Sequence, residues 1–203
     1  LIALRRVQPG EDLLSALIAV EESGDRLAPE ELVAMVVQLI YAGHETTRNL
    51  IGNGLYCLLS HPAELARLRA EPGLLTSAVE EMLRYEPPII FLSRTALQEV
   101  EVGGLELARG ELLHLSIASA NRDPSTFPEP DRFDVARADN RHVTFGFGAH
   151  FCIGAAIARM EARVAFEELL TRFEVIELAG EPRWASDTAL RTLESFPVRL
   201  AAA

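Results

Sequence analysis

One cysteine, Cys152, occupies a position where its sulfur could hold a metal ion. It lies in the run FGFGAHFCIG at residues 145–154, and a helical pattern follows at about residues 153–170. A helix that begins here would direct its first N–H groups and the positive end of its dipole toward the sulfur, which favours the charged thiolate. The thiolate is the form of cysteine that binds metals, so the position predicts a metal-bound Cys152. A cysteine that merely fills space before a helix is the alternative if this run stood alone.

The rest of this run suits a flat ligand with an anionic edge. Gly146 and Gly148 can adopt left-handed backbone angles, and Gly154 has no side chain that would hold such a ligand away. Phe145 can shield the sulfur, and His150 can hydrogen-bond an anionic group of the ligand.

A second cluster of chemically active residues, AGHETT at residues 42–47, lies within a long predicted helix. Gly43 weakens the helix locally and admits a ligand close to the backbone, while the Thr46 hydroxyl can compete for the carbonyl of Ala42 one turn back. We therefore expect a widened turn that presents the hydroxyl of Thr46 and the carboxylate of Glu45. A kinked helix with a polar face is the alternative.

The helix that carries this cluster is predicted to run from Pro29 to Ser60. Acidic residues follow the first proline, and Pro62 ends the pattern. At 1.5 Å rise per residue such a helix would be roughly 45–50 Å long. Gln38 and the polar cluster interrupt its apolar run before about 18 apolar residues accumulate, so a membrane span fits poorly and a buried central helix fits better.

Helical and strand patterns alternate unevenly along the rest of the chain. A helix is predicted over Leu75–Tyr85, with Glu81 and Arg84 three residues apart on one face, a spacing that is weak evidence by itself. Short strands over residues 89–117 predict a small antiparallel sheet, followed by a proline-rich meander at residues 123–137 and by terminal strands. The expected fold class is therefore mainly α, of the α+β type.

The run at residues 145–154 resembles the haem-binding loop of the cytochromes P450, the haem-thiolate monooxygenases. Its aromatic residue, glycines, histidine and cysteine stand at that family's spacing. The resemblance implies that Cys152 binds the iron of haem b, and that Phe145, Gly146 and His150 belong to the cofactor site.

The resemblance extends to the long helix, which in this family crosses the distal face of the haem. Ala42 and Gly43 would then lie against the cofactor. Thr46 would match the threonine that hydrogen-bonds bound dioxygen, and Glu45 its acidic neighbour in proton delivery.

Further residues match positions of the same family. Glu81 and Arg84 would form its structural carboxylate–arginine pair, completed by Arg132 from the meander. Arg94 would pair with a haem propionate, although a surface charge on an edge strand is the alternative. The residues that would line the substrate pocket are Ile90, Leu92, Ala189 and Leu190.

The resemblance covers essentially the whole chain but only the C-terminal part of the family's fold. Residues 1–203 are therefore expected to form a single partial domain, and the chain opens at Leu1 without an initiator methionine. The helices that roof the substrate pocket in the family would be missing.

Composition agrees with a bacterial enzyme of the cytoplasm. The formal charge of −11 argues against general nucleic-acid binding. Cys57 lies inside the long predicted helix, and two thiols without a disulfide pattern fit a reducing compartment. All 19 basic residues are arginine, which is typical of GC-rich bacterial genomes.

The expected function is a monooxygenase that inserts one atom of O2 into a small hydrophobic organic substrate. The resemblance implies electrons from NAD(P)H through ferredoxin and ferredoxin reductase, with no nucleic acid or membrane as partner. Four arginines near the cysteine loop could form a basic docking patch, or could equally be solvated surface charges: Arg137, Arg141, Arg159 and Arg163. One alternative function is a haem-free truncated remnant without activity; another is a zinc or thiol-hydrolase site that combines Cys152 with His150 and His142.

Overall fold

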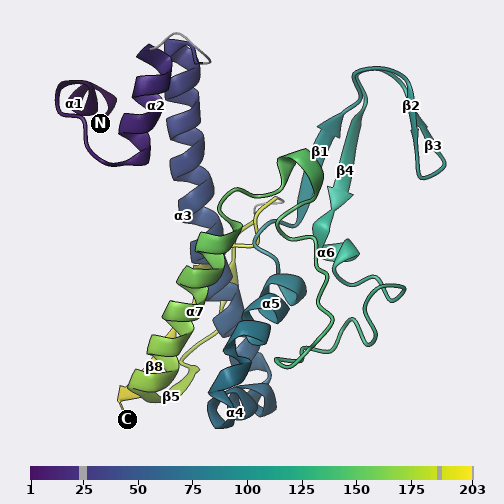
Figure 1. Cartoon of the computed structure of the whole chain (residues 1–203). Helices are drawn as coiled ribbons and strands as arrows, with labels where there is room; N and C mark the ends of the chain where they lie inside the picture. Colours follow the sequence, from purple (N-terminus) through teal and green to yellow (C-terminus); the bar gives the residue numbers. More distant parts are fainter. Residues whose placement is uncertain (23–26, 187–188, 203) are drawn as a thin grey trace. The chain divides into compact units, whose positions relative to one another are not determined.

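The computed structural model describes residues 1–22, 27–186 and 189–202 of the 203-residue chain. Contacts between residues divide the chain into two compact units, Leu1–Glu45 and Thr46–Ala203, which are described separately. Figure 1 follows the chain through both of them. The expectation of one partial domain stays a prediction.

The first unit contains α1 (Ile2–Val7), α2 (Leu13–Glu22) and the beginning of α3 (Pro29–Ser60). Asp12 starts α2, because its Oδ1 accepts the backbone N–H of Ser15 at 2.8 Å. Arg6 joins the two short helices through an ion pair with Glu21 at 3.0 Å.

The long helix α3 begins and ends at the predicted residues. Glu31 supports its start, since its Oε2 accepts the backbone N–H of Ala28 at 2.9 Å. The helix continues as an α-helix through residues 42–47, so the widened turn expected there does not interrupt it. Within the described ranges, no helix combines the length and the hydropathy needed to cross a bilayer.

Burial differs between the two parts of α3. From Thr46 onward it supplies core residues such as Leu50 and Leu58. Earlier in the helix Leu32 is buried, but Val37 and Ile40 are more than 60% exposed. The first part of α3 is therefore much less buried in this chain than the second, and its burial in a longer protein stays a prediction.

The core of the second unit forms where α3 meets three further helices: α4 (Pro62–Ala70), α5 (Leu75–Tyr85) and α7 (Ala155–Arg172). A short 3-10 turn, η1 (Pro72–Leu74), leads into α5. Gly54 allows the close approach, because a Cβ there would lie 2.7 Å from Met82 Sδ and 2.9 Å from Phe166 Cζ. These contacts fix α5 against α7, the helix that follows the cysteine loop in the sequence.

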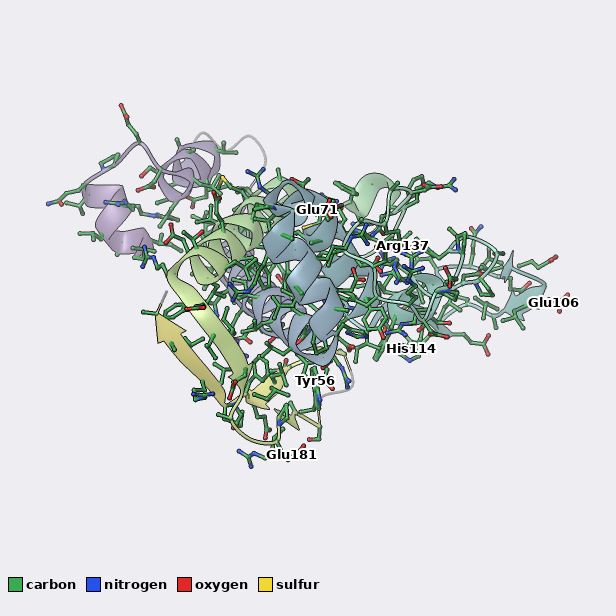
Figure 2. All side chains as sticks on the ribbon, turned by 90° about the horizontal axis from the view of Figure 1, so that it is seen from below. Tyr56, Glu71, Glu106, His114, Arg137 and Glu181 are labelled. Atoms are coloured by element: carbon green, nitrogen blue, oxygen red, sulfur yellow. The ribbon has the colours of Figure 1, made fainter. Side chains whose placement is uncertain are left out.

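Among the described residues, the strands pair into small two-stranded antiparallel sheets, as the sequence predicts. The pairs are β1 (Phe91–Thr95) with β4 (Leu112–Ser116), β2 (Val100–Val102) with β3 (Leu105–Leu107), β5 (Phe173–Leu178) with β8 (Val198–Ala202), and β6 (Arg183–Trp184) with β7 (Leu193–Ser195). Gly103 and Gly104 form the β2–β3 turn with φ of 59° and 80°. Glu106 on this hairpin lies well away from the side chains packed around α5 (Figure 2).

A long irregular segment connects these strands to the cysteine loop. The short helix α6 (Ile117–Ala120) follows β4, and the next helical turn is η2 (Gly148–His150). Phe127, Phe133 and Val135 in this segment are almost fully buried, so it packs as an ordered meander.

Candidate functional site

The cysteine loop has the backbone that its glycines predict. Gly146 and Gly148 adopt φ of 75° and 71°, where a side chain would be strained. The backbone N–H of Cys152 donates to the carbonyl of Phe145 at 2.9 Å, which closes the loop. Helix α7 begins at Ala155, two residues later than expected from the sequence. Cys152 therefore lies just before the helix, and its side chain is exposed.

The two thiols of the chain lie in opposite environments. Cys57 is buried in the core, and burial raises the pKa of its thiol, so it is held in the unreactive protonated form. Cys152 is exposed at a helix start, where metal binding by a thiolate is favoured.

The surroundings of Cys152 fit a flat, largely apolar group held by one protein ligand. Phe147 and Ile153 are 91% and 92% exposed, so the loop offers apolar surface that such a group would cover. A Cβ added at Gly148 would meet no atom within 4 Å, and one at Gly154 would lie 3.9 Å from the Cys152 sulfur. In the described ranges no group of three or more His, Cys, Asp or Glu side chains could hold a metal ion. The donor set therefore suits haem iron better than a zinc centre.

The zinc or thiol-hydrolase alternative also loses its second histidine. The side chain of His142 is only 2% exposed, and its Nε2 lies 3.0 Å from Glu80 Oε2. His150 is exposed in η2, two residues before Cys152, and within the described part of the chain it forms no ion pair with an acid, as a cysteine–histidine–acid site requires.

Arg94 lies exposed on β1. Its Nη1 donates to the carbonyl of the preceding residue, Ser93, at 2.8 Å. This position leaves both interpretations of Arg94 open, a propionate ligand and an edge-strand charge.

The AGHETT cluster lies where the two compact units meet in the sequence, with Glu45 in the first and Thr46 in the second. Ala42, Gly43 and His44 are exposed, whereas Glu45 and Thr46 are half-buried. Nδ1 of His44 lies 3.3 Å from Oε1 of Glu45, so a second proton-carrying group adjoins the carboxylate.

Three of the four predicted substrate-pocket residues meet in one place. The backbone N–H of Ile90 donates to the carbonyl of Ala189 at 2.9 Å, and Leu190 forms an antiparallel bridge with Ile89. Leu92 follows on β1 and is half-buried. Residues about 100 positions apart in the sequence thus form one apolar edge.

Polar side chains that the sequence did not single out hold this edge in place. Arg191 Nε lies 2.6 Å from Glu86 Oε1, and its guanidinium carbon lies 3.8 Å from the ring centroid of Trp184. Two asparagines of α3 reach the same segment. Asn53 donates to the carbonyl of Arg191, and Asn49 to the hydroxyl of Thr192, each at 2.9 Å.

Glu81 and Arg84 form the ion pair that their spacing predicts. Both side chains are fully buried, with Arg84 Nε 2.7 Å and Nη2 2.8 Å from the two carboxylate oxygens. Other N–H groups of Arg84 donate to backbone carbonyls of the meander: Asn121, Pro130 and Arg132. The pair therefore fastens α5 to the segment that leads to the cysteine loop.

The third arginine of this network is Arg137, and the expectation for Arg132 is wrong. Arg137 Nε lies 3.1 Å from Glu81 Oε2, and its side chain is 10% exposed. The side chain of Arg132 is 53% exposed and pairs with Glu129 and Asp134. Only the carbonyl of Arg132 takes part, as an acceptor for Arg84 and Arg137.

A second network, which sequence reasoning missed, begins at the neighbouring Glu80. Arg159 of α7 pairs with both of its carboxylate oxygens, Nε at 2.7 Å and Nη2 at 2.9 Å. Burial opposes the charge on Glu80, but hydrogen bonds from His142 and Arg159 outweigh it and lower the pKa of this carboxyl to about 2. The signal was the double acid at residues 80–81, which places two carboxylates on different sides of one helix.

Three of the four arginines expected near the loop have acidic partners. Arg137 pairs with Glu81, Arg159 with Glu80, and Arg141 with Asp139 at 3.0 Å. Arg163 is exposed on α7. Arg137 and Arg159 are therefore held within the fold, whereas the side chain of Arg141 is 73% exposed despite its partner, so Arg141 and Arg163 stay open to both interpretations, a docking patch and solvated surface charges.

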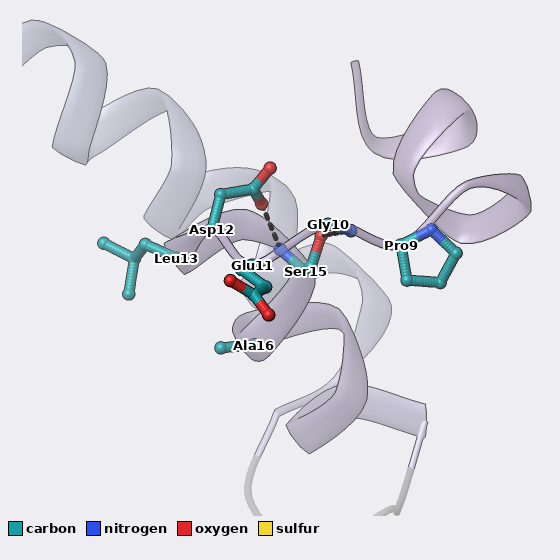
Figure 3. A pocket seen from close by; sticks show the side chains of 7 residues that line it. All are labelled: Pro9, Gly10, Glu11, Asp12, Leu13, Ser15 and Ala16. Atoms are coloured by element: carbon teal, nitrogen blue, oxygen red, sulfur yellow. Dashed lines mark hydrogen bonds between the residues drawn. The ribbon is translucent and has the colours of Figure 1, made fainter.

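A shallow depression of about 490 Å³ lies in the first unit, around the start of α2 (Figure 3). Its lining residues are Pro9, Gly10, Glu11, Asp12, Leu13, Ser15 and Ala16. None of the predicted site residues belongs to it.

The sequence profile of the family described as "Cytochrome P450" matches residues 4–195. The chain belongs to the cytochrome P450 family. It is 48% identical over 203 residues to cytochrome P450 107B1 of Saccharopolyspora erythraea, covering 98% of this chain and 50% of that protein. It is also 48% identical to the cytochrome P450 monooxygenase PikC of Streptomyces venezuelae, with 98% and 49% covered.

Solved structures agree with these relatives. The myxobacterial cytochrome P450 CYP267B1 in complex with myristic acid superposes with a TM-score of 0.93 at 46% identity, over 97% of this chain and 50% of that one. The fold is therefore that of part of a cytochrome P450, mainly helical with small antiparallel sheets. The chain spans about half the length of the curated relatives it matches.

Proposed function

We propose that this chain supplies the haem-binding part of a bacterial haem-thiolate monooxygenase. The observation that carries the proposal is an exposed cysteine in a glycine-hinged loop at the start of α7, in a chain of the cytochrome P450 family. Haem b held by a thiolate supplies the oxygen chemistry, because the sulfur pushes electron density into the iron and favours O–O cleavage.

The residues around Cys152 would bind and orient the cofactor. Cys152 would supply the sulfur, Gly146 keeps the loop in its left-handed turn, and Phe145 would shield the sulfur once the cofactor is bound. His150 and Arg94 would hold the anionic edge, since both are exposed cationic or hydrogen-bonding side chains.

The AGHETT cluster would manage protons on the face of the haem opposite Cys152. The Thr46 hydroxyl would donate a hydrogen bond toward dioxygen, and the Glu45 carboxyl would resupply the proton that is used. His44 Nδ1, 3.3 Å from Glu45 Oε1, would be a further proton carrier. Ala42 and Gly43 would allow close approach, because a Cβ at Gly43 meets nothing within 4 Å.

The substrate we infer is a small hydrophobic organic molecule. Ile90, Leu92, Ala189 and Leu190 would line its site, since three of them already form one apolar edge. The myristic acid in a similar structure supports an apolar ligand.

Electrons would come from NAD(P)H through a ferredoxin and its reductase in the cytoplasm, where thiols stay reduced. An acidic ferredoxin would be steered toward Arg141 and Arg163, so its association should slow as salt rises. Charge reversal at both arginines should weaken ferredoxin-dependent reduction, and unchanged reduction would move the docking site elsewhere.

The decisive experiment compares the two cysteines in the whole natural protein that contains this chain. Reduced and exposed to carbon monoxide, the wild type should show the red-shifted Soret band of thiolate ligation. Cys152→Ala should lose this band, whereas Cys57→Ala, the matched control, should keep it. The reverse pattern would reject Cys152 as the ligand.

A second experiment tests the proton role of Thr46. Thr46→Ala should keep haem and substrate but form less product per NAD(P)H consumed, because the hydroxyl that orients oxygen is gone. Thr46→Ser, which restores a hydroxyl, should recover most of the coupling. Equal coupling in wild type and Thr46→Ala would remove Thr46 from the mechanism.

The alternative of a haem-free remnant rests on the chain's length, about half that of its relatives. Haem titration of the 203-residue chain separates the two proposals. Stoichiometric haem uptake by the chain would reject the remnant.

A further inference from the structure

Arg159 connects the cysteine loop to α5 through two different side-chain contacts. Its guanidinium pairs with both oxygens of Glu80 on α5, at 2.7 and 2.9 Å. The same group lies over the ring of Phe145, with its central carbon 4.4 Å from the ring centroid. The carbonyl of Phe145 in turn accepts the N–H of Cys152. A single side chain thus touches α5, the aromatic residue of the loop and, through one backbone hydrogen bond, the cysteine.

The opposite end of the loop is fastened to the same carboxylate. The backbone N–H of Thr144 donates to Nδ1 of His142 at 3.3 Å, so in the neutral ring the proton sits on Nε2 and can be donated to Glu80. Thr144 also donates its hydroxyl hydrogen to the carbonyl of Leu83 at 2.7 Å. Glu80 therefore receives donors from both sides of Phe145 in the sequence.

The charge of Arg159 lies against the ring of Phe145 in the cysteine loop. Its side chain is 35% exposed, so water screens it only in part. The hydrogen bond to Glu80 raises the pKa of Arg159, burial opposes this, and the negative charge of Cys152 raises it further.

We propose that Arg159 is a positioning residue for the cysteine ligand: it fixes the Phe145 ring and forms with Glu80 a charge pair that tunes the reduction potential of the haem that Cys152 would hold. This inference rests on the proposed haem binding by Cys152. Arg159 itself touches neither substrate nor the reacting atoms.

The two charges of the pair predict shifts of opposite sign. Reduction adds negative charge at the cofactor, so loss of the Arg159 cation should lower the potential. Loss of the Glu80 anion should raise it, provided that Arg159 stays in place. Glu80→Gln should keep Arg159 in place, because the amide oxygen can still accept a hydrogen bond from Arg159 and the ring contact with Phe145 remains.

The experiment is a potentiometric titration of the haem-loaded whole protein with three substitutions and a control. Arg159→Gln should lower the equilibrium constant for reduction at least threefold. For one electron, at ~59 mV per tenfold change, this lowers the reduction potential by about 28 mV. Glu80→Gln should raise it, and Arg159→Lys, which keeps the charge, should stay near the wild type. Arg163→Gln removes the same charge one helical turn further along α7 and should shift the potential much less.

The outcomes separate this inference from the function it rests on. A wild type without the thiolate Soret band overturns both. If the band is present, shifts of equal sign for Arg159→Gln and Glu80→Gln, or an equal shift for Arg163→Gln, overturn the positioning role. If Arg159→Gln does not load haem, Arg159→Lys and Glu80→Gln still decide, because the inference requires their potentials to differ from each other.

Discussion

Glu80 and Glu81 are neighbours on α5, yet their surroundings differ sharply. Glu81 is fully buried and accepts hydrogen bonds from Arg84, Arg137, Asn140 and the backbone of Asp134. Glu80 is 24% exposed and pairs with His142, which precedes the cysteine loop, and with Arg159 of α7. Successive helical residues point about 100° apart, so one helix can fasten the fold with one side chain and support the site with the next.

The difference in burial predicts a difference in consequence. A buried charge that loses its partner has no water to replace it, whereas a partly exposed one is rehydrated. Substitutions at Glu81 should therefore act on folding, and those at Glu80 on the loop and its electrostatics.

The largest expected effect is that of Glu81→Ala. The substitution leaves the guanidinium of Arg84 buried without its carboxylate, which typically costs about 3–5 kcal/mol, a large share of a domain's stability. Little folded, haem-loaded protein should be recovered, as measured by soluble yield and haem content. Glu80→Ala is the matched control and should yield far more. A folded Glu81→Ala protein with normal haem content would contradict the structural role.

Arg137→Ala should come second. It removes one donor from Glu81 and breaks hydrogen bonds to meander carbonyls at Pro128 and Arg132, while Arg84 still neutralises the carboxylate. Hydrogen bonds to charged groups contribute about 1.5–3 kcal/mol, so a loss of that order is expected in chemical denaturation. A change below about 0.5 kcal/mol would show that Arg137 is dispensable in this network.

Local signals in the sequence predicted much of the fold. The bounds of α3 follow from its prolines and acidic first turn, and α5 follows from its apolar spacing. The loop glycines adopt the left-handed angles that their type favours. Such features depend on residues a few positions apart. The Glu81–Arg84 pair was predictable for the same reason, because its partners are one helical turn apart.

Contacts between distant segments were not predictable in this way. Arg132 and Arg137 both lie in an irregular segment without periodicity, and only the folded meander decides that Arg137 reaches Glu81. Arg159 is 79 residues from Glu80, and no spacing rule connects them. The same holds for Arg191, which secures the apolar edge through Glu86.

Acid should weaken the Glu80 network in a defined window. The pKa of Glu80 is about 2 in the folded protein against 4.5 for the unperturbed carboxyl, so the ionised form is favoured by folding. Its contribution is fully present above about pH 4.5 and is lost as the pH falls toward 2. Glu80→Gln should therefore be less stable than the wild type at pH 7, and the gap should narrow across this window. Urea unfolding at a series of pH values measures it, and a gap independent of pH would contradict the assignment.

The smallest effect should come from Arg132→Ala, although the family resemblance gave this residue a structural role. Its side chain is half exposed and pairs with Glu129 at 3.1 Å and Asp134 at 3.7 Å, contacts that water and salt screen. Its carbonyl, which accepts from Arg84 and Arg137, is unchanged by the substitution. A loss of at most about 1 kcal/mol is expected in the same denaturation assay used for Arg137→Ala. If Arg132→Ala proves as destabilising as Arg137→Ala, the Glu81 network depends on an exposed side chain as much as on a buried one. Burial would then not explain why the networks of Glu81 and Glu80 differ in their effect on folding.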